Sequence, residues 1–157
     1  MKGAEDVPVP GVVGLDHTAD VGLEVTAEDL PELFQRAALA TTWLLLERPP
    51  GARGGGSPES RSVELVEEEL PQLLRSWLRV VLLWDEADGF VSNDMELVFL
   101  PAPLCRSETG QGFGLQGNAK GGVDPGHRIR EIKGVTLHGL TVERRGEGWF
   151  ARVIFDV

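Results

Sequence analysis

Acidic residues that could bind a cation occur near both ends of the sequence. Asp16, His17 and Asp20 lie within one short segment, and Asp156 precedes the terminal carboxylate of Val157. Carboxylates in a tight turn commonly accept hydrogen bonds from backbone N–H groups, so turn capping is one interpretation of the first group. A cation site with oxygen ligands is the other, and it needs further carboxylates from elsewhere in the chain. The last strand could supply them.

The end of the chain favours a hard cation. The residues Val153, Ile154 and Phe155 are strongly strand-forming, which predicts that the end is held in a sheet with Asp156 and Phe155 on opposite faces. A terminal acid that frays into solvent is the alternative. Held in the sheet, Asp156 and the Val157 carboxylate offer several oxygens and no thiolate. Such ligands suit Ca²⁺, Mg²⁺ or Mn²⁺ better than Zn²⁺.

Few other residues indicate chemistry. Lys133 lies in an expected strand, where it is either a solvated outward residue or a functional one. The sequence contains neither the phosphate-binding pattern Gly-x-x-x-x-Gly-Lys-Ser/Thr nor the Gly-x-Ser-x-Gly pattern of a nucleophilic serine. The single cysteine, Cys105, excludes an internal disulfide and is expected to be structural.

Hydrophobic periodicity predicts the elements that must position these residues. One helix begins at the cap Asp29, with Glu32 three residues later as in a capping box, and a second runs from Leu70 to Trp84. Strands are expected at 11–15, 21–25, 63–65, 95–100, 112–120, 132–143 and 149–157. These elements predict an α+β fold, a two-layer sandwich with two main helices packed on one face of a mostly antiparallel sheet. Residues 1–10 are expected to be a flexible leader and 11–157 a single domain.

Composition narrows the choice of partners. With 25 acidic against 15 basic residues the net charge is −10, which disfavours direct binding of nucleic acid and suits a basic partner or a hard cation. Solubility alone is the alternative explanation of the charge. No apolar run reaches the roughly 20 residues that span a bilayer, and the start lacks the hydrophobic segment of a signal peptide. The single cysteine fits a reducing compartment, so a cytoplasmic protein without a membrane partner is expected.

Three motifs in a fixed order resemble the archease family. They are the segment Asp16-His17-Thr18-Ala19-Asp20-Val21-Gly22-Leu23, the segment from Ile132 to Leu140, and the strand from Trp149 to Val157. The resemblance implies a non-enzymatic cofactor of an RtcB-type RNA ligase, which acts in tRNA splicing and RNA repair. The family is thought to promote guanylylation and multiple turnover of that ligase.

The resemblance also implies roles for particular residues. It assigns a divalent cation, Ca²⁺ or else Mg²⁺ or Mn²⁺, to Asp20, Asp156 and the Val157 carboxylate. Lys133 is a further functional position, and the neighbours Asp16 and His17 support the site. Two positions depart from the family: Gly134 and Leu137 stand where Ala and Tyr are frequent. A tyrosine contact to the partner is therefore not expected.

Two other classes of protein remain as alternatives. A small Mg²⁺- or Mn²⁺-dependent phosphoester hydrolase could use the same carboxylates, but it would be expected to add a base or a basic clamp around the metal, and only Lys133 and His17 are candidates. A general chaperone would need an exposed apolar patch, which the sequence does not indicate outside the core stripes.

Overall fold

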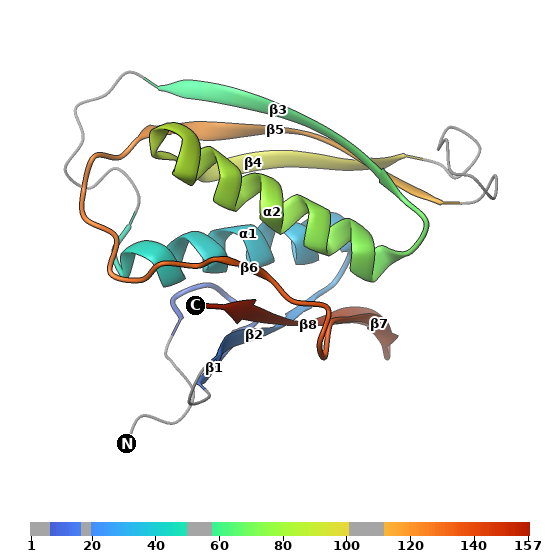
Figure 1. Cartoon of the computed structure of the whole chain (residues 1–157). Coiled ribbons are helices and arrows are strands. Elements are labelled where there is room, and N and C mark those ends of the chain that lie inside the picture. Colours follow the sequence, from blue (N-terminus) through green and yellow to red (C-terminus); the bar gives the residue numbers. More distant parts are fainter. Residues whose placement is uncertain (1–6, 17–19, 50–57, 101–111) are drawn as a thin grey trace.

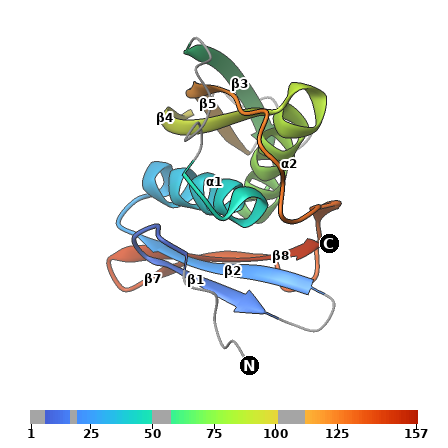
Figure 2. The same ribbon diagram turned by 90° about the vertical axis from the view of Figure 1, so that its left-hand side faces the viewer.

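Two antiparallel sheets enclose a layer of two helices (Figures 1 and 2). The structure is a computed structural model, and it describes residues 7–16, 20–49, 58–100 and 112–157. Cys105 and His17 lie outside these ranges, and Asp16 is described by its backbone alone. No helix within these ranges is long and apolar enough to cross a membrane.

The larger sheet contains the two segments that carry the candidate ligands. Its central strands β2 (Asp20–Ala27) and β8 (Gly148–Asp156) run antiparallel over eight paired residues, and β1 (Val12–Asp16) adds to the outer edge of β2. Two short strands, β6 (Gly134–Val135) and β7 (Thr141–Arg145), pair with the other edge of β8. The smaller sheet has the order β3 (Glu59–Glu67), β5 (Phe113–Val123) and β4 (Phe90–Leu100).

The helices begin where local sequence predicts. In α1 (Leu30–Leu46) the carboxylate of Asp29 accepts the backbone N–H of Glu32 at 2.8 Å, and the Glu32 carboxylate accepts the N–H of Glu28 at 3.2 Å. These bonds satisfy N–H groups that the first turn leaves without intrahelical partners. In α2 (Leu70–Asp88) the helix ends at Gly89, whose φ of 79° is the left-handed conformation that glycine adopts at little cost.

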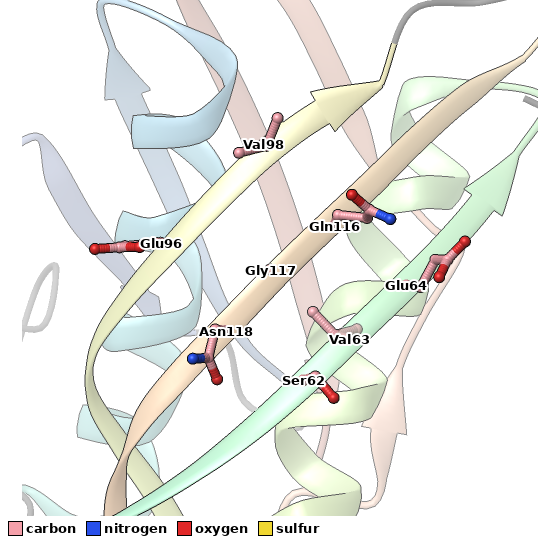
Figure 3. Close-up of a pocket in the computed structure, with 8 residues that line it drawn as sticks. All are labelled: Ser62, Val63, Glu64, Glu96, Val98, Gln116, Gly117 and Asn118. Atoms are coloured by element: carbon pink, nitrogen blue, oxygen red, sulfur yellow. The ribbon is translucent and has the colours of Figure 1, made fainter. Parts of the chain in front are cut away.

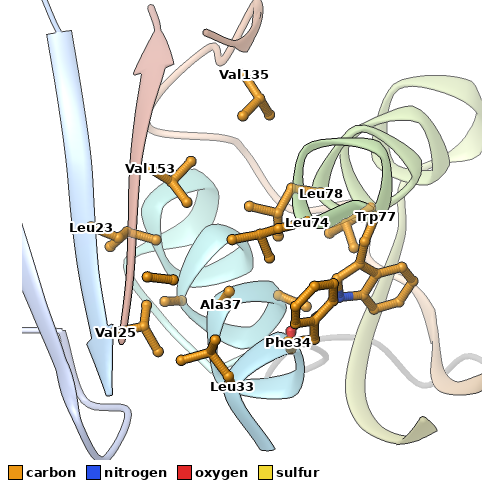
Figure 4. Packing of buried hydrophobic residues seen from close by; sticks show 14 of the residues in the cluster. Leu23, Val25, Leu33, Phe34, Ala37, Leu74, Trp77, Leu78, Val135 and Val153 are labelled. Carbon is orange, nitrogen blue, oxygen red and sulfur yellow. The ribbon is translucent and has the colours of Figure 1, made fainter. Parts of the chain in front are cut away.

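One hydrophobic core joins the helices to both sheets. Figure 4 shows its part between the helices and the larger sheet. Leu23 and Val153 reach it from the larger sheet, Leu115 reaches it from the smaller one, and all three are fully buried. Trp77 of α2 belongs to the same core, and its indole N–H donates to the carbonyl of Phe34 at 3.0 Å. A buried indole N–H needs such a partner, because leaving it unpaired costs about 1–3 kcal/mol.

The predicted α+β class and the antiparallel pairing are confirmed, but the strands form two sheets where one was expected. The helices therefore have a sheet on each side. The reason is visible on α1, which buries Ala40, Thr42 and Leu46 in addition to the stripe that includes Leu33 and Ala37. A helix with one apolar stripe covers one surface, whereas a helix buried around most of its circumference must be covered from two sides.

Two expectations about single elements need correction. The strand expected over 132–143 is interrupted, because residues 136–140 form a turn in which Gly139 has a φ of 68° and Leu140 N–H bonds the Leu137 carbonyl at 3.3 Å. At the other end of the chain, Val7 lies in the segment expected to be a flexible leader, yet it is 5% exposed and joins the core.

Candidate functional site

The sheet register brings two of the expected ligands together. Asp20 is the first residue of β2, Asp156 is the last residue of β8, and the two are directly opposite in the antiparallel pairing. Directly opposite residues have Cβ atoms about 4.5–5.5 Å apart and project to the same face of the sheet. Convergence of these two carboxylates, expected from the sequence, is therefore confirmed, whereas their role as metal ligands stays a prediction.

The carboxylate pair faces away from the core. The neighbours of the pair, Val21 and Phe155, are buried at 6% and 0% exposure, so alternation along each strand directs Asp20 and Asp156 to the outer face. Asp156 is exposed and Asp20 is partly exposed. Two like charges this close repel each other, and a bound cation would offset that repulsion.

The structure places the other residues expected at the site, Val157, Asp16 and His17, only in part. Val157 follows Asp156 directly and packs its side chain partly buried against the core, which keeps the end of the strand in the sheet. Asp16 closes β1, where its backbone pairs with Val21. The side chain of Asp16 and the whole of His17 lie outside the described residues, so their expected support of the site stays a prediction.

Lys133 is joined to the acidic pair through its backbone. Its N–H donates to the carbonyl oxygen of Asp156 at 2.7 Å, and the next residue, Gly134, is the register partner of Asp156 on β6. The side chain of Lys133 is exposed and lines a hollow beside α2, together with Arg79 and Glu86. The functional role expected for Lys133 stays a prediction, and the side of the strand on which its ammonium group lies could not be told from the sequence.

The donor set suits a hard cation. The expected ligands Asp20 and Asp156 would offer carboxylate oxygens, and the Val157 terminal carboxylate, also an expected ligand, is adjacent in sequence. No group of three His, Cys, Asp or Glu side chains gathers within metal-binding reach in the ranges that the structure describes. Ca²⁺ takes six to eight oxygens, so backbone carbonyls and water would complete the shell.

A buried ion pair, which sequence reasoning missed, positions the segment that leads to Lys133. Arg48 binds both carboxylate oxygens of Asp124 at 2.7 Å, and the Asp124 side chain is only 1% exposed. The hydrogen bonds that Arg48 donates to the Asp124 carboxylate raise the pKa of Arg48, whose guanidinium therefore stays charged. Arg128 then binds Asp85 at 2.7 Å, and Arg130 donates to the Leu44 carbonyl at 2.7 Å. These contacts fasten the segment to both helices.

A separate hollow lies on the outer face of the smaller sheet (Figure 3). Its volume is about 420 Å³, and it is lined by Ser62, Glu64, Glu96, Val98, Gln116 and Asn118 among others. Its two glutamates come from β3 and β4, on either side of the amides of β5. Among the described residues that line this hollow there is no histidine, cysteine, lysine or arginine, so they offer neither a nucleophile with its base nor a basic clamp.

The fold and the site together define a class of protein: a small α+β domain with a pair of acidic residues at one end of its larger sheet. The model of the Archease protein family matches residues 14–157, which is most of the chain. The chain therefore belongs to the archease family.

Individual relatives agree with this assignment. The protein archease of Archaeoglobus fulgidus is 31% identical over 144 residues, which cover 91% of this chain and 96% of the relative. The protein archease of Pyrococcus abyssi is 29% identical, covering 90% and 95% respectively. The solution structure of protein 1598 from Methanobacterium thermoautotrophicum has a TM-score of 0.73 at 29% identity, covering 94% of this chain and 99% of that one. A Thermotoga maritima archease, described as a possible chaperone, has a TM-score of 0.50 at 19% identity and shows the fold alone.

Proposed function

We propose that this protein is a cation-binding accessory factor that activates an RtcB-type RNA ligase by promoting its guanylylation and multiple turnover. The observation that carries the proposal is the register pairing of Asp20 with Asp156, which gathers two carboxylates at the end of the larger sheet. Membership of the archease family supports the choice of an RNA ligase as partner, because that partner is what the resemblance of the sequence implies. The protein itself does not catalyse ligation in this proposal.

The proposed cation is Ca²⁺, Mg²⁺ or Mn²⁺, held by Asp20, Asp156 and the terminal carboxylate of Val157. A bound divalent cation would supply positive charge that neutralises these acids and can also attract oxygen ligands of a partner. The chain's own residues hold the position of that charge. The backbone bond from Lys133 N–H to the Asp156 carbonyl and the buried side chain of Phe155 fix the end of β8.

The charge of the chain favours a protein partner over RNA. The net charge is −10, and nucleic acid binding depends on basic groups that neutralise phosphates. Several arginines that could do so are already bound to acids, as with Arg48 and Asp124 or Arg61 and Asp88. An accessory factor that touches the ligase fits this surface better than one that holds the RNA.

The test follows guanylylation of a cognate ligase with and without the protein. Asp20→Asn and Asp156→Asn each remove one charge from the pair, and both are expected to abolish stimulation under multiple-turnover conditions. Glu96→Gln is the matched control, because it removes one exposed carboxylate from the other sheet and is expected to stimulate like the wild type. A wild-type protein that leaves the ligase unaffected would refute the proposal. Metal-dependent phosphoester hydrolysis by the isolated protein, lost in the same variants, would replace it with an enzyme.

A further inference from the structure

A groove runs beside α2, next to the acidic pair. It consists of two adjoining hollows of about 350 and 390 Å³ between α2 and the segment 128–134, and both hollows are lined by Leu82, Glu86, Ile132 and Lys133. Two contacts hold that segment against the helix. Arg75 donates to the Val135 carbonyl at 2.9 Å, and Arg128 binds Asp85 at 2.7 Å. The groove is therefore a fixed feature of the fold.

The groove combines apolar walls with unpaired positive charge. Arg79 and Lys133 both line the hollow nearer Gly134, and within the described ranges neither has a carboxylate at ion-pairing distance. Other arginines of the chain, such as Arg48, Arg61 and Arg128, do have acidic partners. The positive side chains of Arg79 and Lys133 therefore favour binding of an acidic group in this hollow.

The apolar part of the groove is exposed. Leu83 is 61% exposed, although Leu82 and Val80 beside it are partly buried against the core. Leu83 is one turn after Arg79 on α2, so the two side chains are neighbours on the helix surface. The acidic side chains lie mostly toward the other hollow, because Asp85 and Glu131 line that hollow and not the one with Arg79. Glu86 lines both, but it is about 10 Å along the helix from Arg79 at 1.5 Å per residue, so the Arg79 end of the groove is the more positive one.

We infer that this groove is the surface that docks on the partner ligase. It receives a protein segment that places an apolar side chain beside Leu83 and a carboxylate between Arg79 and Lys133. Charge complementarity selects this occupant, because a basic segment would meet two unpaired cations and a wholly apolar one would leave them desolvated. The inference rests on the proposed function, since it names the contact surface of that partner.

The position of the groove would bring a docked partner close to the acidic pair of Asp20 and Asp156. Gly134 lines the end of the groove and is also the register partner of Asp156. A segment bound along α2 therefore ends beside the strand that carries Asp156. Docking and the acidic pair remain separate surfaces, because Asp20 and Asp156 lie on the outer face of the sheet and the groove lies on the side of α2.

The test measures the dissociation constant of the protein and a cognate ligase by titration calorimetry. Arg79→Glu and Leu83→Ser change exposed or partly exposed positions, and each is expected to weaken binding by about tenfold, which is about 1.4 kcal/mol. Lys120→Glu is the matched control, because it reverses the charge of an exposed lysine on the smaller sheet that likewise has no carboxylate partner among the described residues. Its binding is expected to equal that of the wild type. Thermal unfolding of every variant verifies the fold.

The acid variants separate this inference from the proposed function. Asp156→Asn is expected to bind the ligase with nearly wild-type affinity and yet fail to stimulate guanylylation. Wild-type binding by both Arg79→Glu and Leu83→Ser would overturn the docking groove and leave the cation proposal standing. Equal weakening by Lys120→Glu would also overturn it, because the effect would then reflect overall charge. Binding of the wild type without any stimulation would overturn the proposed function instead.

Discussion

Asp20 and Asp156 occupy the same register position on neighbouring strands, one as the first residue of β2 and the other as the last of β8. Two residues separated by most of the sequence thus become nearest neighbours through sheet pairing. The paired strands are held by buried side chains such as Leu23 and Val153. The carboxylates are therefore positioned by the core without belonging to it.

The first prediction concerns the stability of the protein with and without a cation. At a Ca²⁺ concentration 100 times the dissociation constant, the wild type should gain about 2.7 kcal/mol in free energy of unfolding, because the cation binds the folded state. Asp20→Asn and Asp156→Asn should lose most of this gain. In the presence of a chelator both variants should be at least as stable as the wild type, since one of two repelling charges is gone.

Chemical denaturation in Ca²⁺ and in chelator measures the difference in the free energy of unfolding. A gain in stability from Ca²⁺ that is unchanged in both variants would place the cation elsewhere.

The second prediction concerns the buried pair of Arg48 and Asp124. Asp124→Ala should lower the free energy of unfolding by about 3 kcal/mol, because the partly buried guanidinium of Arg48 would lose a partner whose carboxylate is fully buried. Urea denaturation measures this loss. Glu143→Ala is the control, since its pair with Arg145 is exposed and such pairs contribute about 0–1 kcal/mol. Equal losses for both variants would contradict the structural role of Asp124.

Local sequence was enough to predict the helices. The cap Asp29 and its partner Glu32 lie within one turn, and each helix has a buried stripe at helical spacing, which includes Leu33 in α1 and Trp77 in α2. Such features depend on near neighbours, so they can be read from the sequence without knowing the fold. The division into two sheets depends instead on how a nearly fully buried α1 is covered, and alternation within single strands carries no information about that.

The candidate site also has features that the sequence predicted and features that depend on tertiary packing. Proximity of Asp20 to Asp156 was expected because a cation would need both, and register pairing between strands distant in sequence produced it. The pair of Arg48 and Asp124 joins residues 76 positions apart, and neither flanking loop suggested it. The groove beside α2 arises only when the segment containing Lys133 packs on the helix. Contacts of this kind depend on tertiary packing, so no single window of sequence could reveal them.

The third prediction concerns the titration of Asp88. A side-chain hydrogen bond from Arg61, at 2.7 Å, holds the pKa of Asp88 below its ordinary value of 3.8. Because its pKa is lower in the folded than in the unfolded state, the Asp88 carboxylate stabilises the fold at pH values above its unfolded-state pKa. This stabilisation is lost as the pH falls through the folded-state pKa. Arg61→Gln should raise the pKa of Asp88, as measured by carboxyl-carbon NMR. Arg144→Gln is the control, because Arg144 stacks on Trp149 and should leave Asp88 unchanged.

The fourth prediction concerns the terminal carboxylate of Val157. A C-terminal amide, introduced by peptide ligation, should weaken Ca²⁺ binding and ligase stimulation, because it removes a charged oxygen ligand without adding bulk. Appending several residues after Val157 should do the same and also crowd the acidic pair, since Val157 follows Asp156 directly. Calorimetric titration with Ca²⁺ measures the first effect, and a guanylylation assay measures the second.

A tag of equal length before Met1 is the control for these C-terminal changes, and it should leave both measurements near wild type. The amide separates loss of charge from steric hindrance. If it binds Ca²⁺ like the wild type while the extension does not, the terminal carboxylate is not a ligand and the extension acts by blocking access to Asp20 and Asp156. If the amide and the extension fail equally, charge at Val157 is required. In that case the side chain of Val157 serves packing at the end of β8, and its terminal carboxylate binds the cation.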